Sequence, residues 1–197
     1  MAGSLTEVVS FIHLNGPPGI GKSTVARLYA ARHPGVLGLD IDQIVTLIGG
    51  WQDMLWGDVF EAGRVLAAAM ARTHLRGGHD VVWPQLMTNQ PEMADFEAAA
   101  TEAGAEYVHV VLMADAESSW TRLSGRTDVG ATEQDLVIQK FVEENGGPVF
   151  LQRVCSQLAE FTATKQIDAT VACGSQTPEQ TCDALEAVLE RVGRLRP

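Results

Sequence analysis

The fold of this chain is decided by the stretch Gly16-Pro17-Pro18-Gly19-Ile20-Gly21-Lys22-Ser23, which fits the P-loop pattern G-x-x-x-x-G-K-[ST] at every fixed position. Its glycines let successive backbone N–H groups turn inward, and Lys22 and the N-terminus of a following helix add positive charge. Such a loop suits a polyphosphate, and the hydroxyl of Ser23 suits Mg2+. We therefore expect the phosphates of ATP, with Mg2+, to bind along Gly16 to Thr24.

Strand-like and helix-like segments alternate around this motif. A β-rich run, 8–14, precedes the loop, and a helix-prone run, 24–32, follows it. Four more apolar runs between helical patterns are interpreted as strands, at 35–42, 80–83, 107–113 and 167–172. The alternation predicts an α/β fold, a three-layer P-loop NTPase with a five-stranded parallel sheet, helices on both faces and a small helical lid.

Length and composition limit the classes of protein that the chain can belong to. Its 197 residues contain no linker or repeat, so we expect one domain, 1–197. The sequence has no leader-like start and no uncharged run near the ~20 residues that span a bilayer, and we expect a cytoplasmic protein. The formal net charge of −11 disfavours nucleic acids and anionic membranes as partners. Three cysteines without C-x-x-C spacing argue against a disulfide framework and a zinc site.

Two carboxylates, Asp40 and Asp42, end the second predicted strand. Ligands of parallel sheets bind beyond the carboxyl ends of the strands, so both side chains are expected beside the P-loop, pointing to the same side of an extended backbone. Mg2+ carried by ATP would relieve their mutual repulsion, leaving one carboxylate for the metal and one to deprotonate an acceptor hydroxyl. The alternative is a solvated turn in which Asp42 caps a helix.

The P-loop followed by Leu39-Asp40-Ile41-Asp42-Gln43-Ile44 resembles the small P-loop kinases that phosphorylate hydroxyls of metabolites and antibiotics: shikimate kinase, gluconate kinase, chloramphenicol phosphotransferase and tunicamycin-resistance proteins. The runs 81–87 and 112–126 look most like the tunicamycin-resistance branch. The resemblance implies that Asp40 lies on the metal side with Ser23, and that Asp42 is the base on the acceptor side.

Two arginines one helical turn apart, Arg122 and Arg126, precede a polar, glycine-containing stretch. The resemblance implies that they belong to a lid at about 122–145 and meet the ATP phosphates, with Arg126 joining Lys22 and Asp42 as catalytic residues. Exposed arginines paired with nearby carboxylates are the alternative. Asp115 resembles the end of a Walker B strand, but a helix follows it, so we expect a helix cap.

The region 43–63 contains no Lys or Arg and looks like an apolar acceptor region. Gln85 follows the third strand on the same sheet edge, and Arg64 lies on the preceding helix. The expected acceptor contacts are Asp42, Trp51, Trp56, Phe60, Arg64 and Gln85. His13, within the first strand, is expected to be a hydrogen-bonded core residue.

These features predict an ATP- and Mg2+-dependent enzyme that moves the γ-phosphoryl group to a hydroxyl of a small, uncharged molecule such as an antibiotic or nucleoside. With an antibiotic as acceptor, this activity confers resistance. One alternative is a nucleoside monophosphate kinase, although its acceptor phosphate needs basic residues that 43–63 lacks. Another is a noncatalytic, regulatory ATP-binding protein.

Overall fold

The structure, a computed structural model, describes residues 8–125 and 133–193, with no description of the side chains of residues 133 and 134. Its strands are β1 (Ser10–Asn15), β2 (Leu37–Gly38), β3 (Val81–Trp83), β4 (Glu106–Met113) and β5 (Ala169–Ala172). They form one sheet in the order β2-β3-β1-β4-β5, and every neighbouring pair is parallel. The predicted five-stranded parallel sheet is confirmed.

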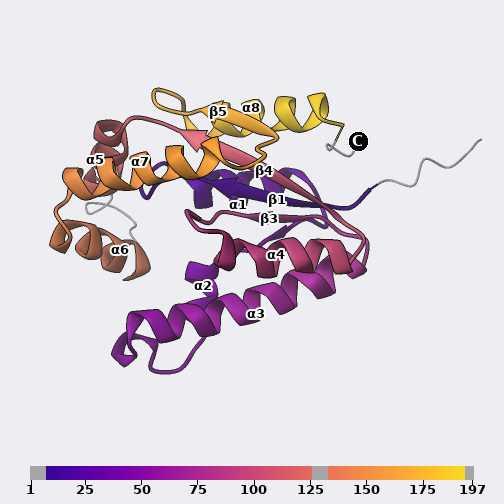
Figure 1. Ribbon diagram of the computed structural model, residues 1–197, viewed down its shortest axis with the longest axis horizontal. Coiled ribbons are helices and arrows are strands. Elements are labelled where there is room, and N and C mark those ends of the chain that lie inside the picture. The colour runs from indigo at the N-terminus through magenta and orange to yellow at the C-terminus, as the bar shows by residue number, and fades with distance from the viewer. Residues whose placement is uncertain (1–7, 126–132, 194–197) are drawn as a thin grey trace, which may run out of the picture.

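Helices cover both faces of this sheet (Figure 1). They are α1 (Lys22–Arg32), α2 (Ile41–Val45), α3 (Trp56–Arg76), α4 (Gln90–Glu102), α5 (Ala116–Ser124), α6 (Glu133–Glu144), α7 (Pro148–Ala163) and α8 (Pro178–Arg191), with a 3-10 turn at Trp51–Asp53. Helices α1 and α8 pack together on one face, and α3 and α4 pack together on the other. The three-layer α/β architecture therefore follows the sequence pattern.

Strand β1 is buried on both faces, which fixes the position of the P-loop at its end. The side chain of Phe11 belongs to the core beneath α3 and α4, whereas Ile12 and Leu14 belong to the core beneath α1 and α8. This continuous burial explains why the sequence of the strand shows little alternation between apolar and polar residues. The loop that follows is thereby held at the centre of the sheet edge.

The turn of the P-loop requires glycine at two positions. Gly19 has φ of 81°, and a Cβ there would lie 2.3 Å from the backbone oxygen of Ser119. Gly21 has φ of 100° and precedes α1 as its N-cap in the left-handed conformation. Larger residues at these positions would strain the backbone or collide with α5, so the glycines set the shape of the loop.

The second predicted strand is much shorter than expected, and this changes the geometry of the acidic pair. Strand β2 contains only Leu37 and Gly38, and the backbone turns into α2 at Ile41. Asp40 is the N-cap of α2, and Asp42 lies in its first turn. The expectation of two carboxylates on one extended strand end is therefore wrong, because helix capping by the short Asp40 side chain ends the strand early.

Two local expectations are confirmed. Asp115 caps α5 by accepting a hydrogen bond of 2.6 Å from the backbone N–H of Ser118. His13 is fully buried, where its Nε2–H donates to the backbone oxygen of Gln85 at 2.8 Å and its Nδ1 accepts from the hydroxyl of Tyr107 at 2.8 Å. Burial, followed by the nearby His109, lowers the pKa of His13 well below its usual value. Across the described ranges, no helix combines the length and apolar character needed to cross a membrane.

Candidate active site

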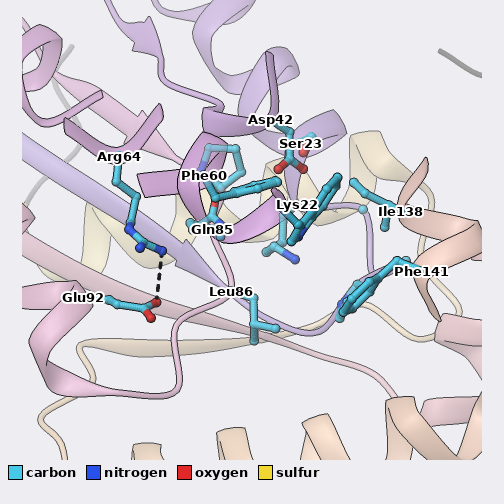
Figure 2. Close-up of a pocket in the computed structure, with 16 residues that line it drawn as sticks. Lys22, Ser23, Asp42, Phe60, Arg64, Gln85, Leu86, Glu92, Ile138 and Phe141 are labelled. Atoms are coloured by element: carbon cyan, nitrogen blue, oxygen red, sulfur yellow. Dashed lines mark ion pairs between the residues drawn. The ribbon is translucent and has the colours of Figure 1, made fainter. Parts of the chain in front are cut away.

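A cavity of about 450 Å3 opens at the carboxyl edge of the sheet. Its walls come from the P-loop, from Asp42 of α2, from α3 and α4, from the loop after β3, and from α6. Figure 2 shows Lys22, Ser23 and Asp42 close together, with Arg64 and Glu92 on one side and Phe141 and Ile138 on the other. The P-loop and several of the residues predicted to contact an acceptor therefore line one cavity.

Lys22 lies folded onto the P-loop. Its ammonium donates hydrogen bonds to the backbone oxygens of Gly16 at 2.8 Å and Pro17 at 3.0 Å. The residue also begins α1, so its charge and the backbone N–H groups of the helix N-terminus gather at one point. This arrangement suits the terminal phosphates of a nucleotide.

Asp40 and Ser23 form the part of the site that fits a divalent cation. The Asp40 side chain is buried, its Oδ1 accepts the backbone N–H of Asp42 at 3.1 Å, and it is hydrogen-bonded to the side chain of Ser23. Burial raises the pKa of Asp40, although the bond from Ser23 opposes this rise. A carboxylate and a hydroxyl are hard oxygen donors of the kind Mg2+ prefers, and Mg2+ usually takes few protein ligands beside phosphates.

Asp42 has the most perturbed carboxyl group at the site. Its pKa is raised to about 7, mainly by burial and next by the negative charge of Asp40, with a smaller rise from Asp135 of α6 and an opposing effect of Lys22. A carboxyl that titrates near neutral pH can take a proton from a hydroxyl more readily than an ordinary aspartate. The expected division of roles between Asp40 and Asp42 is thus consistent with their different surroundings, although they lie on a helix start rather than a strand.

Aromatic side chains from two separate elements line one wall of the cavity. Trp56 lies beside Phe60 on α3, with ring centroids 4.5 Å apart. Its ring also stacks on that of Phe141 of α6, with centroids 6.1 Å apart and an angle of 10° between the ring planes. Trp51, in contrast, is only 7% exposed and packs in the core beneath α3 and α4. The expectation that Trp51 contacts the acceptor is therefore corrected, because its apolar ring completes that core.

Arg64 and Gln85 both line the cavity, as expected for acceptor contacts. The guanidinium of Arg64 pairs with Glu61 and lies 3.7 Å from Glu92 (Figure 2). Gln85 is held through its backbone oxygen by His13. The charge of Arg64 is thus already matched by two carboxylates, and this wall of the cavity carries little unbalanced positive charge.

Arg122 occupies a different place from the one expected. Its guanidinium donates to the backbone oxygens of Ile20 at 3.1 Å, Cys173 at 2.6 Å, Gly174 at 2.7 Å and Gln176 at 3.3 Å. It therefore joins the P-loop to the loop between β5 and α8 through backbone oxygens. Arg126 and the stretch that follows it lie outside the described residues.

Several residues of the cavity did not stand out in the sequence. Phe141 and Ile138 belong to α6, and Glu92 and Leu86 come from α4 and the loop before it. The spacing of Ile138 and Phe141, three residues apart, places them on one helix face, which is the signal that could have found them. A helix face alone does not say which distant element it meets.

The fold and its P-loop define this protein as a P-loop NTPase. Residues 11–143 match the family described as AAA domain, and the chain belongs to this family. No curated protein matches the sequence.

Solved structures of small kinases share this fold, as the sequence resemblance predicts. A gluconokinase from Sinorhizobium meliloti 1021 is 17% identical over 94% of this chain and 94% of its own, with a TM-score of 0.59. The tunicamycin resistance protein of Deinococcus radiodurans is 16% identical over 96% of this chain and 99% of its own, with a TM-score of 0.55. A chain of an RNA repair complex is 16% identical over 85% of this chain but only 49% of its own, with a TM-score of 0.66. At these identities the likeness concerns the fold.

Proposed function

We propose that this protein is an ATP- and Mg2+-dependent phosphotransferase that moves the γ-phosphoryl group to a hydroxyl of a small, uncharged molecule, such as an antibiotic or nucleoside. The observation that carries the proposal is the position of Asp42, whose pKa is about 7, in the same cavity as Lys22 and Ser23. A phosphate-binding loop facing a carboxyl that titrates near neutral pH is the combination that phosphoryl transfer to an alcohol needs.

Each residue has a defined part in this reaction. The P-loop N–H groups and Lys22 bind the phosphates, and Ser23 and Asp40 would hold the Mg2+ that neutralises phosphate charge when it is bound. Ionised Asp42 accepts the proton of the acceptor hydroxyl. The hydroxyl oxygen bonds to the γ-phosphorus while the bond between the γ-phosphorus and the oxygen of the leaving ADP breaks. The phosphorylated alcohol and ADP are the products.

The cavity walls favour an acceptor without negative charge. Arg64, the cation on the acceptor wall, is matched by Glu61 and Glu92, and Asp42 adds further acidity. The rings of Trp56 and Phe141 offer a flat apolar surface. An anionic acceptor would meet carboxylates there, whereas an uncharged ring-containing alcohol would bury apolar area against the rings.

The proposal is tested by measuring ATP consumption with a panel of antibiotics and nucleosides, followed by mass spectrometry of each acceptor that accelerates it. Acceptor-dependent consumption with one phosphoryl group added to the alcohol supports the proposal. Rapid phosphorylation of AMP, CMP or UMP would instead identify a nucleoside monophosphate kinase. ATP binding without acceptor-dependent turnover across the panel would favour a noncatalytic, regulatory ATP-binding protein.

A further inference from the structure

Helix α3 has an exposed face that points away from the core of the protein. Figure 1 shows this helix at the periphery, with α4 between it and much of the rest of the chain. The positions that follow one another at alternating intervals of four and three residues are Asp58, Ala62, Val65, Ala69, Arg72 and Arg76. Val65 is 61% exposed, and the neighbouring Leu66 and Met70 are 47% and 42% exposed. The alternating spacing keeps the six positions on one side of the helix, where Val65 is the large apolar side chain.

Two residues of different size on this face lie at equal distances from Ala67 along the helix. Val65 and Ala69 lie two residues on either side of Ala67. When the exposed faces of two such helices pack antiparallel about a two-fold axis at the height of Ala67 along the helix, Val65 of each copy lies opposite Ala69 of the other. A bulky residue then meets a small one at both contacts, which allows the helices to approach closely.

The charges along the same face are also complementary under this symmetry. Asp58 lies nine residues before Ala67 and Arg76 nine residues after it, five helical turns apart and hence on one face. The antiparallel arrangement therefore places Asp58 of each copy opposite Arg76 of the other. Arg76 lies 3.9 Å from Glu102 of its own chain and is 58% exposed, so it remains accessible to a second carboxylate.

A groove beside this stripe completes the complementary surface. Residues of α3 and the edge strand β2, including Leu37, Leu66 and Met70, line an open groove of about 550 Å3. The groove adjoins Ala69, the position that faces Val65 of the opposite copy. Burying exposed apolar side chains from both copies would supply the attraction, and the end charges would fix the antiparallel register.

We propose that the protein forms a homodimer in which the α3 helices of two copies pack antiparallel along the stripe from Asp58 to Arg76. This surface faces away from the cavity wall formed by Trp56 and Phe60. The inference is independent of the phosphotransferase proposal, because it concerns oligomeric state and needs no acceptor.

The test is the molar mass of the protein across a concentration series, measured by sedimentation equilibrium. We expect twice the 21.2 kDa chain mass at high concentration. Val65→Glu should weaken the dimer about tenfold or more, since it places two carboxylates near the two-fold axis. Val149→Glu is the matched control, because Val149 is 72% exposed on α7, away from this face. Circular dichroism verifies that both variants are folded.

A charge exchange tests the register. Asp58→Arg should weaken the dimer by opposing two arginines, and adding Arg76→Asp should restore it, whereas a parallel pair would gain nothing from the exchange. A monomer at all concentrations, equal effects of Val65→Glu and Val149→Glu, or no recovery in the double variant would each overturn the proposal.

Discussion

The backbone N–H of Asp42 donates a hydrogen bond of 3.1 Å to the Oδ1 of Asp40, so the first turn of α2 holds the two acidic residues together. Asp40 thereby has its charge stabilised by the helix N-terminus and by Ser23. Asp42 lacks these bonds and experiences the charge of Asp40 at close range. Helix capping is thus what gives the two carboxyls different chemistry.

The first prediction concerns the pH dependence of turnover. Because the pKa of Asp42 is about 7, the fraction that is ionised falls as the pH drops below that value. We expect kcat/KM for the acceptor to fall about tenfold for each pH unit below 7 and to level off above it. A profile that stays flat down to pH 5 would remove Asp42 from the role of base.

The second prediction concerns stability. The pKa of Asp42 is higher in the folded state than the ordinary value of 3.8, so protonation favours folding, and this contribution is lost as the pH rises through about 7. Asp42→Asn should therefore be more stable than the wild type at pH 8, on the order of 2 kcal/mol or roughly 4–8 °C in Tm. The difference should vanish near pH 4. Thermal unfolding at both pH values measures it, and a variant that is less stable at pH 8 contradicts the account.

The third prediction concerns Arg122. Its four bonds to backbone oxygens join the P-loop to the loop 173–176, so Arg122→Ala should weaken ATP binding about tenfold. Arg122→Lys should recover only part of the affinity, because one ammonium cannot reproduce the fork of a guanidinium. Titration calorimetry with ATP measures both, and Arg191→Ala, at the exposed end of α8, is the control. Wild-type affinity in both Arg122 variants would show that the loop is held by other contacts.

The fourth prediction concerns the aromatic wall. Phe141→Ala removes the ring that stacks on Trp56 and should raise the KM for a ring-containing acceptor about tenfold, with ATP affinity nearly unchanged. Leu136→Ala, which truncates another exposed residue of α6, is the matched control and should leave both constants near wild type. An equal loss of ATP affinity in Phe141→Ala would place the ring on the nucleotide side of the cavity.

The sequence predicted the parts of this protein that depend on local pattern. The P-loop follows from eight consecutive residues, and β4 follows from one apolar run buried in the sheet. The cap at Asp115 was also predicted, because a helical run follows this short acidic side chain directly.

The parts that sequence reasoning missed depend on contacts between distant segments. Trp51 and Trp56 are equally aromatic, and only packing beneath α3 sends one into the core and leaves the other in the cavity. Arg122 was predicted to be a phosphate ligand from its place in the sequence, but its guanidinium donates to carbonyl oxygens of the loop 173–176. Neither outcome has a signature in the neighbouring residues.

The most direct test of the central claim follows the phosphoryl group itself. With the acceptor found by screening, γ-labelled ATP and Mg2+, the wild type should move the label to the alcohol. Asp42→Asn should bind ATP with nearly unchanged affinity and transfer label about 10²–10⁴ times more slowly. Label transfer at the wild-type rate by Asp42→Asn would contradict the account.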